Sequence, residues 1–122
     1  MGNLTDFFGI TTEALSNEFI TSNTLTAAAS VEINYTDAQI FNLTPNQNTT
    51  LDIINPIVGI QKDIIITGAG VSYTIAFTVS GGSGTFNKIS GDYDDAASAK
   101  NLISITCHSS TEFWYSISQI AV

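Results

Sequence analysis

The nine residues Val71–Val79 constrain the fold of this chain more than any other stretch. Apolar side chains occupy the odd positions and small or hydroxyl side chains the even ones, in the order Val-Ser-Tyr-Thr-Ile-Ala-Phe-Thr-Val. Because successive side chains of a strand point to opposite faces, this alternation predicts a half-buried strand whose odd-numbered face lies on a core. Glycines lie on both sides of the stretch, so we expect sharp turns and antiparallel neighbours.

The same period of two recurs along the chain from about residue 25. Further strands are predicted over residues 31–35, 39–44, 49–54, 62–67, 85–89, 100–106 and 113–120. The turn residues at 45–48 predict a hairpin between 39–44 and 49–54, and the last two strands are predicted to form another. We therefore predict an all-β fold, an antiparallel β-sandwich or barrel-like subunit.

Two of these strands carry more apolar surface than one sheet face can hide. The triplet Ile64, Ile65 and Ile66 has no polar face, so its strand is predicted to be covered on both sides. In the last strand, Trp114 and Ile120 lie on the face opposite the expected core. A single small chain rarely buries both faces of one sheet, so we predict that these five residues form the interface of an intertwined trimer.

Composition bounds the class of protein. A chain of 122 residues is long enough for one domain with one core. Its formal net charge of -8 disfavours nucleic acid and anionic membranes as partners. Because only 11% of residues are charged while 43% are hydrophobic, we expect weakly hydrated surface that another subunit can cover. The single cysteine, Cys107, is expected to be a small buried side chain.

The first 23 residues differ from the rest and are predicted to form an N-terminal docking arm, with the β-domain at 24–122. Residues 12–19 favour about two helical turns, the one brief helix that we expect. An apolar patch, Phe7-Phe8-Gly-Ile10, precedes this segment. The predicted docking residues are Phe7, Phe8, Ile10, Leu15 and Phe19. The alternative to docking is that the apolar patch belongs to the core of its own chain.

A set of short motifs lies between residues 38 and 120. They are Phe41-x-Leu43-Thr44, Asn48-Thr-Thr-Leu51, Asn55-Pro56, Gly59-x-Gln61 and Trp114-Tyr115-x-Ile117. Their order resembles that of the small trimeric β-domains of tailed-bacteriophage virion proteins, which occur in tail fibres, head fibres and capsid decoration proteins. The resemblance implies a three-fold homotrimer in which sheets of neighbouring subunits bury each other's faces.

Within that group, a short chain that begins at its own methionine is more similar to a head decoration, or cement, protein than to a fibre. The expected partner is then the major capsid protein, and the expected location is the outer capsid surface of the virion after synthesis in the host cytoplasm. No export signal is recognised at the N-terminus. The alternative is a head- or tail-fibre domain that binds a host receptor or glycan, with Tyr93 and Trp114 beside Asp92, Asp94 and Asp95.

Few residues suggest catalysis, and we expect neither an enzyme nor a cofactor. The only histidine, His108, lies in a turn beside Ser109, where a base and nucleophile seldom align. Asp92, Asp94 and Asp95 are weak candidates for a Ca²⁺ site, because alternate carboxylates in a loop can supply several oxygen ligands. The alternative is a solvated loop whose aspartates close turns.

Overall fold

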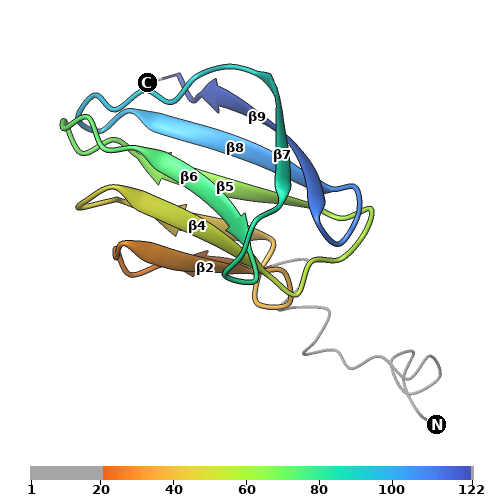
Figure 1. Ribbon diagram of the computed structural model, residues 1–122. Coiled ribbons are helices and arrows are strands. Elements are labelled where there is room, and N and C mark those ends of the chain that lie inside the picture. The colour runs from red at the N-terminus through yellow and green to blue at the C-terminus, as the bar shows by residue number, and fades with distance from the viewer. Residues whose placement is uncertain (1–20, 122) are drawn as a thin grey trace, which may run out of the picture.

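The computed structural model describes residues 21–121, which form two β-sheets packed face to face (Figure 1). The six-stranded sheet has the order β1-β3-β5-β8-β9-β7 and the three-stranded sheet the order β2-β4-β6. No residue from 21 to 121 is helical, so this part of the chain contains no helix able to cross a membrane. The predicted all-β, two-layer architecture is confirmed. The strands are β1 (Ser22–Thr24), β2 (Ser30–Asn34), β3 (Ile40–Leu43), β4 (Thr49–Ile54), β5 (Gln61–Thr67), β6 (Ile75–Val79), β7 (Thr85–Ser90), β8 (Lys100–Cys107) and β9 (Glu112–Gln119).

The first six strands alternate between the two sheets along the chain. Each strand enters the sheet opposite to its predecessor and pairs in parallel with the strand two places along the chain: β1 with β3, β3 with β5, β2 with β4, and β4 with β6. This half of the domain is therefore solenoid-like. Parallel strands need a crossover between them. Here the strand of the opposite layer provides it.

The predicted hairpin between residues 39–44 and 49–54 is wrong. Residues 44–48 carry the chain from β3 in the larger sheet to β4 in the smaller one. Strand β4 instead lies between β2 and β6, where the amide of Thr50 donates to the Ala29 carbonyl and the amide of Thr49 to that of Thr74. Each strand buries its apolar face equally well whether the two strands lie in opposite sheets or pair side by side in one sheet. Local sequence therefore did not distinguish the two arrangements.

The last three strands extend the larger sheet. Strands β8 and β9 form the predicted antiparallel hairpin, and β8 also pairs antiparallel with β5. Strand β7 runs parallel to β9 at the sheet edge, with a register shift between Lys88 and Ser90. Five of the seven strand pairings in the described chain are parallel, so the predicted antiparallel sandwich is correct in its layers and wrong in most of its pairings.

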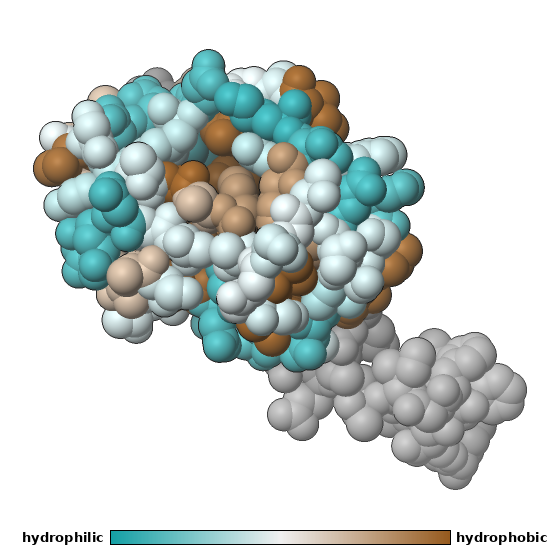
Figure 2. Space-filling model, viewed as in Figure 1, coloured by the Kyte–Doolittle hydropathy of each residue, from teal (hydrophilic) through white to brown (hydrophobic). Residues whose placement is uncertain are grey.

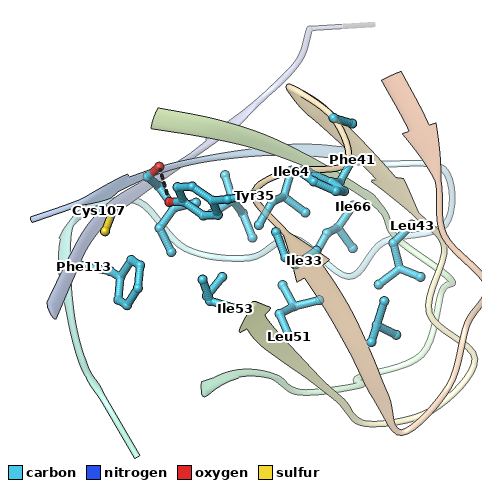
Figure 3. Packing of buried hydrophobic residues seen from close by; sticks show 14 of the residues in the cluster. Ile33, Tyr35, Phe41, Leu43, Leu51, Ile53, Ile64, Ile66, Cys107 and Phe113 are labelled. Carbon is cyan, nitrogen blue, oxygen red and sulfur yellow. Dashed lines mark hydrogen bonds between the residues drawn. The ribbon is translucent and has the colours of Figure 1, made fainter. Parts of the chain in front are cut away.

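The core lies between the two sheets (Figure 3). Ile64 and Ile66 of β5 are fully buried in it, whereas Ile65 lies on the other face of the strand and is half-buried. The single chain therefore already covers Ile64 and Ile66, and they offer no surface to a second copy. We correct the predicted trimer interface accordingly by removing these two residues. The core side chains labelled in Figure 3 are Ile33, Tyr35, Phe41, Leu43, Leu51, Ile53, Ile64, Ile66, Cys107 and Phe113.

Tyr35 and Lys62 are polar side chains that are fully buried among the apolar ones. The Tyr35 hydroxyl donates to the Ile105 carbonyl oxygen at 3.4 Å, and burial raises the pKa of this hydroxyl far above its usual value. The Lys62 ammonium lies 5.6 Å from the centre of the Tyr35 ring. A cation over an aromatic face is favourable, more so where water is excluded. Cys107 is buried as predicted, and its thiol donates to the Ser109 carbonyl oxygen at 3.1 Å.

The stretch Val71–Val79 is a strand only from Ile75 onward. Its odd positions from 75 to 79 face the core, as predicted. The first residues form a tight turn instead, in which the Tyr73 amide donates to the Val71 carbonyl at 2.7 Å. Val71 is 50% exposed as a result.

Strand β1 begins two residues before the predicted start of the β-domain at 24. Ser22–Thr24 pairs with Ile40–Asn42 and forms one edge of the larger sheet. The predicted docking residues and the brief helix at 12–19 lie outside the described residues.

Candidate binding site

A cleft opens where the larger sheet extends beyond the smaller one. The smaller sheet ends at β6, whereas β8, β9 and β7 continue the larger sheet past β5. The cleft has a volume of about 310 Å³. In Figure 2 apolar side chains gather in a hollow on the side where β6 and β7 lie. We call this site the aromatic cleft, and it is lined by Tyr73, Thr74, Ile75, Phe77, Lys88, Tyr93, Ile103, Tyr115 and Ile117.

A cluster of aromatic rings forms the floor of the aromatic cleft. The Phe77 ring lies 4.8 Å from that of Tyr115 and stacks 5.2 Å from that of Phe86. Phe86 in turn stacks on the buried Phe113 at 5.0 Å. Such ring pairs add about 0.5–1.5 kcal/mol beyond the area they bury. The floor is therefore held in place by the core below it.

One wall of the cleft is Tyr93, which lies in the loop between β7 and β8. The buried Asn101 anchors this loop at the next residue: its side-chain oxygen accepts from the Asp94 amide and its NH₂ group donates to the Asp94 carbonyl, each at 2.8 Å. The Gln119 amide group donates to the Asp92 carbonyl at 2.8 Å and to the Asn101 side-chain oxygen at 2.8 Å. Tyr93 is thus held between two anchored residues.

Close backbone approach fixes the start of the same loop. Gly91 has a φ of +85°, and a Cβ atom there would overlap the Ile117 carbonyl oxygen of β9. Only glycine adopts this conformation without strain and leaves room for the neighbouring strand. The loop therefore lies directly on the sheet.

The Tyr93 hydroxyl is the unusual polar atom of the site. It is buried, and it has no hydrogen-bond partner within the described residues. Desolvation by burial raises the pKa of this hydroxyl, and the carboxylates of Asp95 and Asp94 raise it further. Buried polar groups are paired in the great majority of cases. The hydrogen-bonding capacity of this hydroxyl is therefore unused within the described residues.

An ion pair lies at the rim of the cleft. The Lys88 ammonium and the Asp92 carboxylate are 2.7 Å apart. Their hydrogen bond raises the pKa of Lys88 and lowers the pKa of Asp92, and charge attraction adds to both shifts. The pair offers both donors and an acceptor without a net charge.

The predicted acidic cluster is divided among separate roles. Asp92 pairs with Lys88, and the Asp94 carboxylate accepts the amide of Ala96 at 3.0 Å, closing a turn. Within residues 21–121 no three carboxylate, histidine or cysteine side chains come together in a way that could hold a metal ion. Of the three aspartates, Asp94 closes a turn, as the alternative interpretation of this segment expected.

Trp114 and Tyr93 do not form one site. Trp114 is 41% exposed on the face of β9 opposite Tyr115, whereas Tyr93 lines the cleft with Tyr115. The His108 ring stacks on that of Trp114, with centroids 4.5 Å apart and planes at 14°. The Ser109 hydroxyl oxygen accepts the amide of Glu112 at 3.1 Å, so it serves the turn.

We call the solvent side of the six-stranded sheet the outer face. The register of the central strands places side chains from four strands in rows across it, for example Asn42, Ile65, Leu102 and Ser118. Of the predicted interface residues, Ile65 and Trp114 lie on the outer face, and Ile120 is exposed just beyond β9. The outer face comprises Ile40, Asn42, Gln61, Asp63, Ile65, Thr67, Lys100, Leu102, Ser104, Thr106, Glu112, Trp114, Ser116 and Ser118.

Sequence reasoning named Tyr93 but missed the cleft itself. Tyr73, Phe77 and Tyr115 come from strands or turns that are far apart in the sequence, and their convergence depends on where the smaller sheet ends. The alternation in β9 did predict that Tyr115 lies on the inner face.

No protein-family model, curated protein or solved structure matches this chain.

Proposed function

We propose that this chain is a structural protein of a tailed-bacteriophage virion, which assembles as a homotrimer through its outer face and decorates the capsid. The single observation that carries the proposal is the character of that face. In a chain with a net charge of -8, the outer face has only two carboxylates, Asp63 and Glu112, and one cation, Lys100, among serine, threonine, asparagine and apolar side chains. The resemblance to trimeric virion β-domains supports the same assignment.

Both carboxylates of the outer face are already engaged. Glu112 accepts hydrogen bonds from the Trp114 indole at 3.1 Å and from the Asn87 side-chain amide at 3.3 Å. Asp63 accepts hydrogen bonds from the Ser104 hydroxyl and the Gln61 side-chain amide, each at 3.3 Å. Covering these two carboxylates therefore costs less than covering carboxylates that only water solvates. Ile65, Leu102 and Trp114 provide apolar surface on the same face.

The dimensions of the outer face suit an interface. Strands about 4.8 Å apart give six of them a width of roughly 24 Å, and eight residues of β8 extend about 27 Å. The product, roughly 650 Å², is of the same order as the roughly 800 Å² that each partner buries in a standard interface.

The edges of the sheet are less suited to assembly. Strand β1 has three residues, and β7 carries a register shift. Short or irregular edge strands are the usual means by which proteins prevent edge-to-edge pairing. Contact through the face is therefore the favoured geometry for the trimer.

Capsid binding is assigned in this proposal to residues 1–20, with the apolar residues Phe7, Phe8 and Ile10 as contacts. Three arms on one trimer bind with a high effective concentration, even where each contact is weak. The β-domain provides the trimeric platform, and the arms provide the attachment to the major capsid protein.

The oligomeric state is the first test. We expect native mass spectrometry and sedimentation velocity to give three copies of the 13.0 kDa chain. Leu102→Glu, at the centre of the outer face, should yield folded monomers because three like charges would meet in a desolvated contact. Val58→Glu, in a loop where the side chain is 64% exposed, is the matched control and should remain trimeric. A wild-type chain that stays monomeric at micromolar concentration would refute the trimer.

Capsid attachment is the second test. A variant that lacks residues 1–20 keeps β1, which begins at Ser22, and should therefore keep the trimer. We expect it to lose co-sedimentation with undecorated capsids, while full-length protein binds. Equal binding by the two proteins would remove the arm from the proposal.

A further inference from the structure

We propose that the aromatic cleft binds one pyranose ring of a neutral glycan. The site belongs to the single chain, so the proposal goes beyond the role in capsid decoration and does not depend on trimer formation. It rests on the shape of the cleft, on the rings that line it and on the polar atoms at its wall and rim.

The rings suit the apolar face of a sugar. Tyr73, Phe77, Tyr93 and Tyr115 enclose a space of about 310 Å³, which is at the small end of ligand sites and fits one or two six-membered rings. A pyranose presents C–H groups on its faces and hydroxyls at its edge. Aromatic side chains pack against the first, and tyrosine hydroxyls bond to the second.

The polar groups suit the edge of the same ring. The buried Tyr93 hydroxyl has no partner among the described residues, and in this proposal a small shift of its side chain lets it donate to a sugar oxygen. Thr74 lines the same cleft, and the Lys88–Asp92 pair at the rim offers both donors and an acceptor. Alternating donors and acceptors match sugar hydroxyls, each of which both donates and accepts.

The charges favour a neutral ligand. Among the described residues, Lys88 is the one cation that lines the cleft, and the Asp92 carboxylate already neutralises it at 2.7 Å. The chain as a whole carries a net charge of -8, which repels phosphates and polyanions. Nucleotides and acidic sugars are therefore disfavoured, although their rings would fit the same space.

The cleft is also preorganised. Asn101 holds the loop that carries Tyr93, and the amide of Thr74 donates to the Asn48 side-chain oxygen at 2.9 Å. The Phe77–Tyr115 contact fixes the floor. A site held in its binding conformation loses little entropy when the ligand enters.

A glycan array probed with labelled full-length protein tests the proposal first, followed by NMR titration with cellobiose, maltose, lactose and chitobiose. We expect saturable shifts at the backbone amides around Tyr73, Phe77, Tyr93 and Tyr115. Tyr73→Ser, which removes one ring, should weaken binding about tenfold, the order expected for one stacking contact. Tyr93→Phe keeps the ring and should weaken it several-fold through the lost hydroxyl.

Val71→Ser is the matched control, since Val71 is exposed two residues before Tyr73 and does not line the cleft. Its affinity should stay within about twofold of wild type, below the loss of one hydrogen bond. The absence of any neutral glycan on the array, shifts confined to the outer face, or full affinity in a Tyr73→Ser/Tyr93→Phe double variant would overturn the proposal. So would shifts at the cleft amides caused by deleting residues 1–20 without sugar, because the arm would then be the occupant. None of these outcomes bears on the trimer.

Discussion

Replacing Asn101 by alanine tests how the loop that carries Tyr93 is held. The Asn101 side chain is fully buried and takes part in four hydrogen bonds of 2.8 to 3.1 Å. Its NH₂ group donates to the Ile66 and Asp94 carbonyls, and its oxygen accepts from the Asp94 amide and the Gln119 side chain. Alanine removes all four bonds at once.

The expected loss of stability follows from these bonds. A hydrogen bond contributes about 1 kcal/mol net, which gives about 4 kcal/mol for four bonds. Asp94 and Gln119 are exposed and can bond water after the truncation, so part of this is recovered. We therefore expect the free energy of unfolding to fall by about 2–4 kcal/mol. For a chain of this size that corresponds to a melting temperature lower by roughly 10 °C.

Urea unfolding followed by circular dichroism gives the change in free energy, and amide hydrogen exchange locates it. The Asp94 amide, which bonds to Asn101 in the wild type, should exchange much faster in the variant. Asn87→Ala is the control, because Asn87 is an exposed strand residue whose side chain makes one hydrogen bond of 3.3 Å to Glu112. Its effect should stay within about 0.5 kcal/mol.

A loss below about 1 kcal/mol in Asn101→Ala, the value of a single net hydrogen bond, would refute this reasoning. Unchanged protection of the Asp94 amide would refute it as well. Either result would mean that the loop is held by contacts other than those of Asn101.

Three further predictions follow from single sites. Gly91→Ala should destabilise the fold by more than about 3 kcal/mol in thermal melts, because the new Cβ would meet a carbonyl oxygen of β9. Gly59→Ala is the control and should cost about 1 kcal/mol, because Gly59 has the same φ of +85° but open space around it. Similar losses in the two variants would contradict the steric argument. Tyr35 has a raised folded pKa, so its contribution is complete below the unfolded value of 10.0 and is lost as pH rises above it, at about 1.4 kcal/mol per pH unit. Urea titrations from pH 8 to 11 should show this slope, and Tyr35→Phe should lack it; a slope that persists in Tyr35→Phe would assign it elsewhere. His108→Ala should shift the emission of Trp114 to the red and change stability by less than about 1 kcal/mol, because the stacked pair is exposed; an unchanged spectrum would argue against the stack.

The alternating pattern determined most of the strand segments and which side of each faces the core, although it missed β1 and extended β6 too far toward Val71. Phe113 is buried and Trp114 is exposed, as the pattern of β9 predicts. Asn55-Pro56 ends β4, and the β8–β9 hairpin forms across the turn that contains His108. These properties depend on neighbours within a few residues, so a single sequence contains them.

The partner of each strand was decided only by the tertiary structure. Strands β3 and β4 are separated by a short turn segment and still lie in opposite sheets. Strand β5 has three consecutive isoleucines, yet one chain buries Ile64 and Ile66 and leaves only Ile65 on the outer face. The partner of a strand depends on the positions of all the other strands, and the local alternation of apolar and polar residues carries no information about that partner.

The aromatic cleft, like the strand pairing, was decided by the tertiary structure. The sequence by itself determined that Tyr73, Phe77 and Tyr115 point to one side of their segments. The tertiary structure alone decided that these segments meet, because the smaller sheet stops at β6 while the larger one continues to β7. The physical reason is that burial is a property of the whole assembled core, whereas side-chain direction is a property of the local backbone.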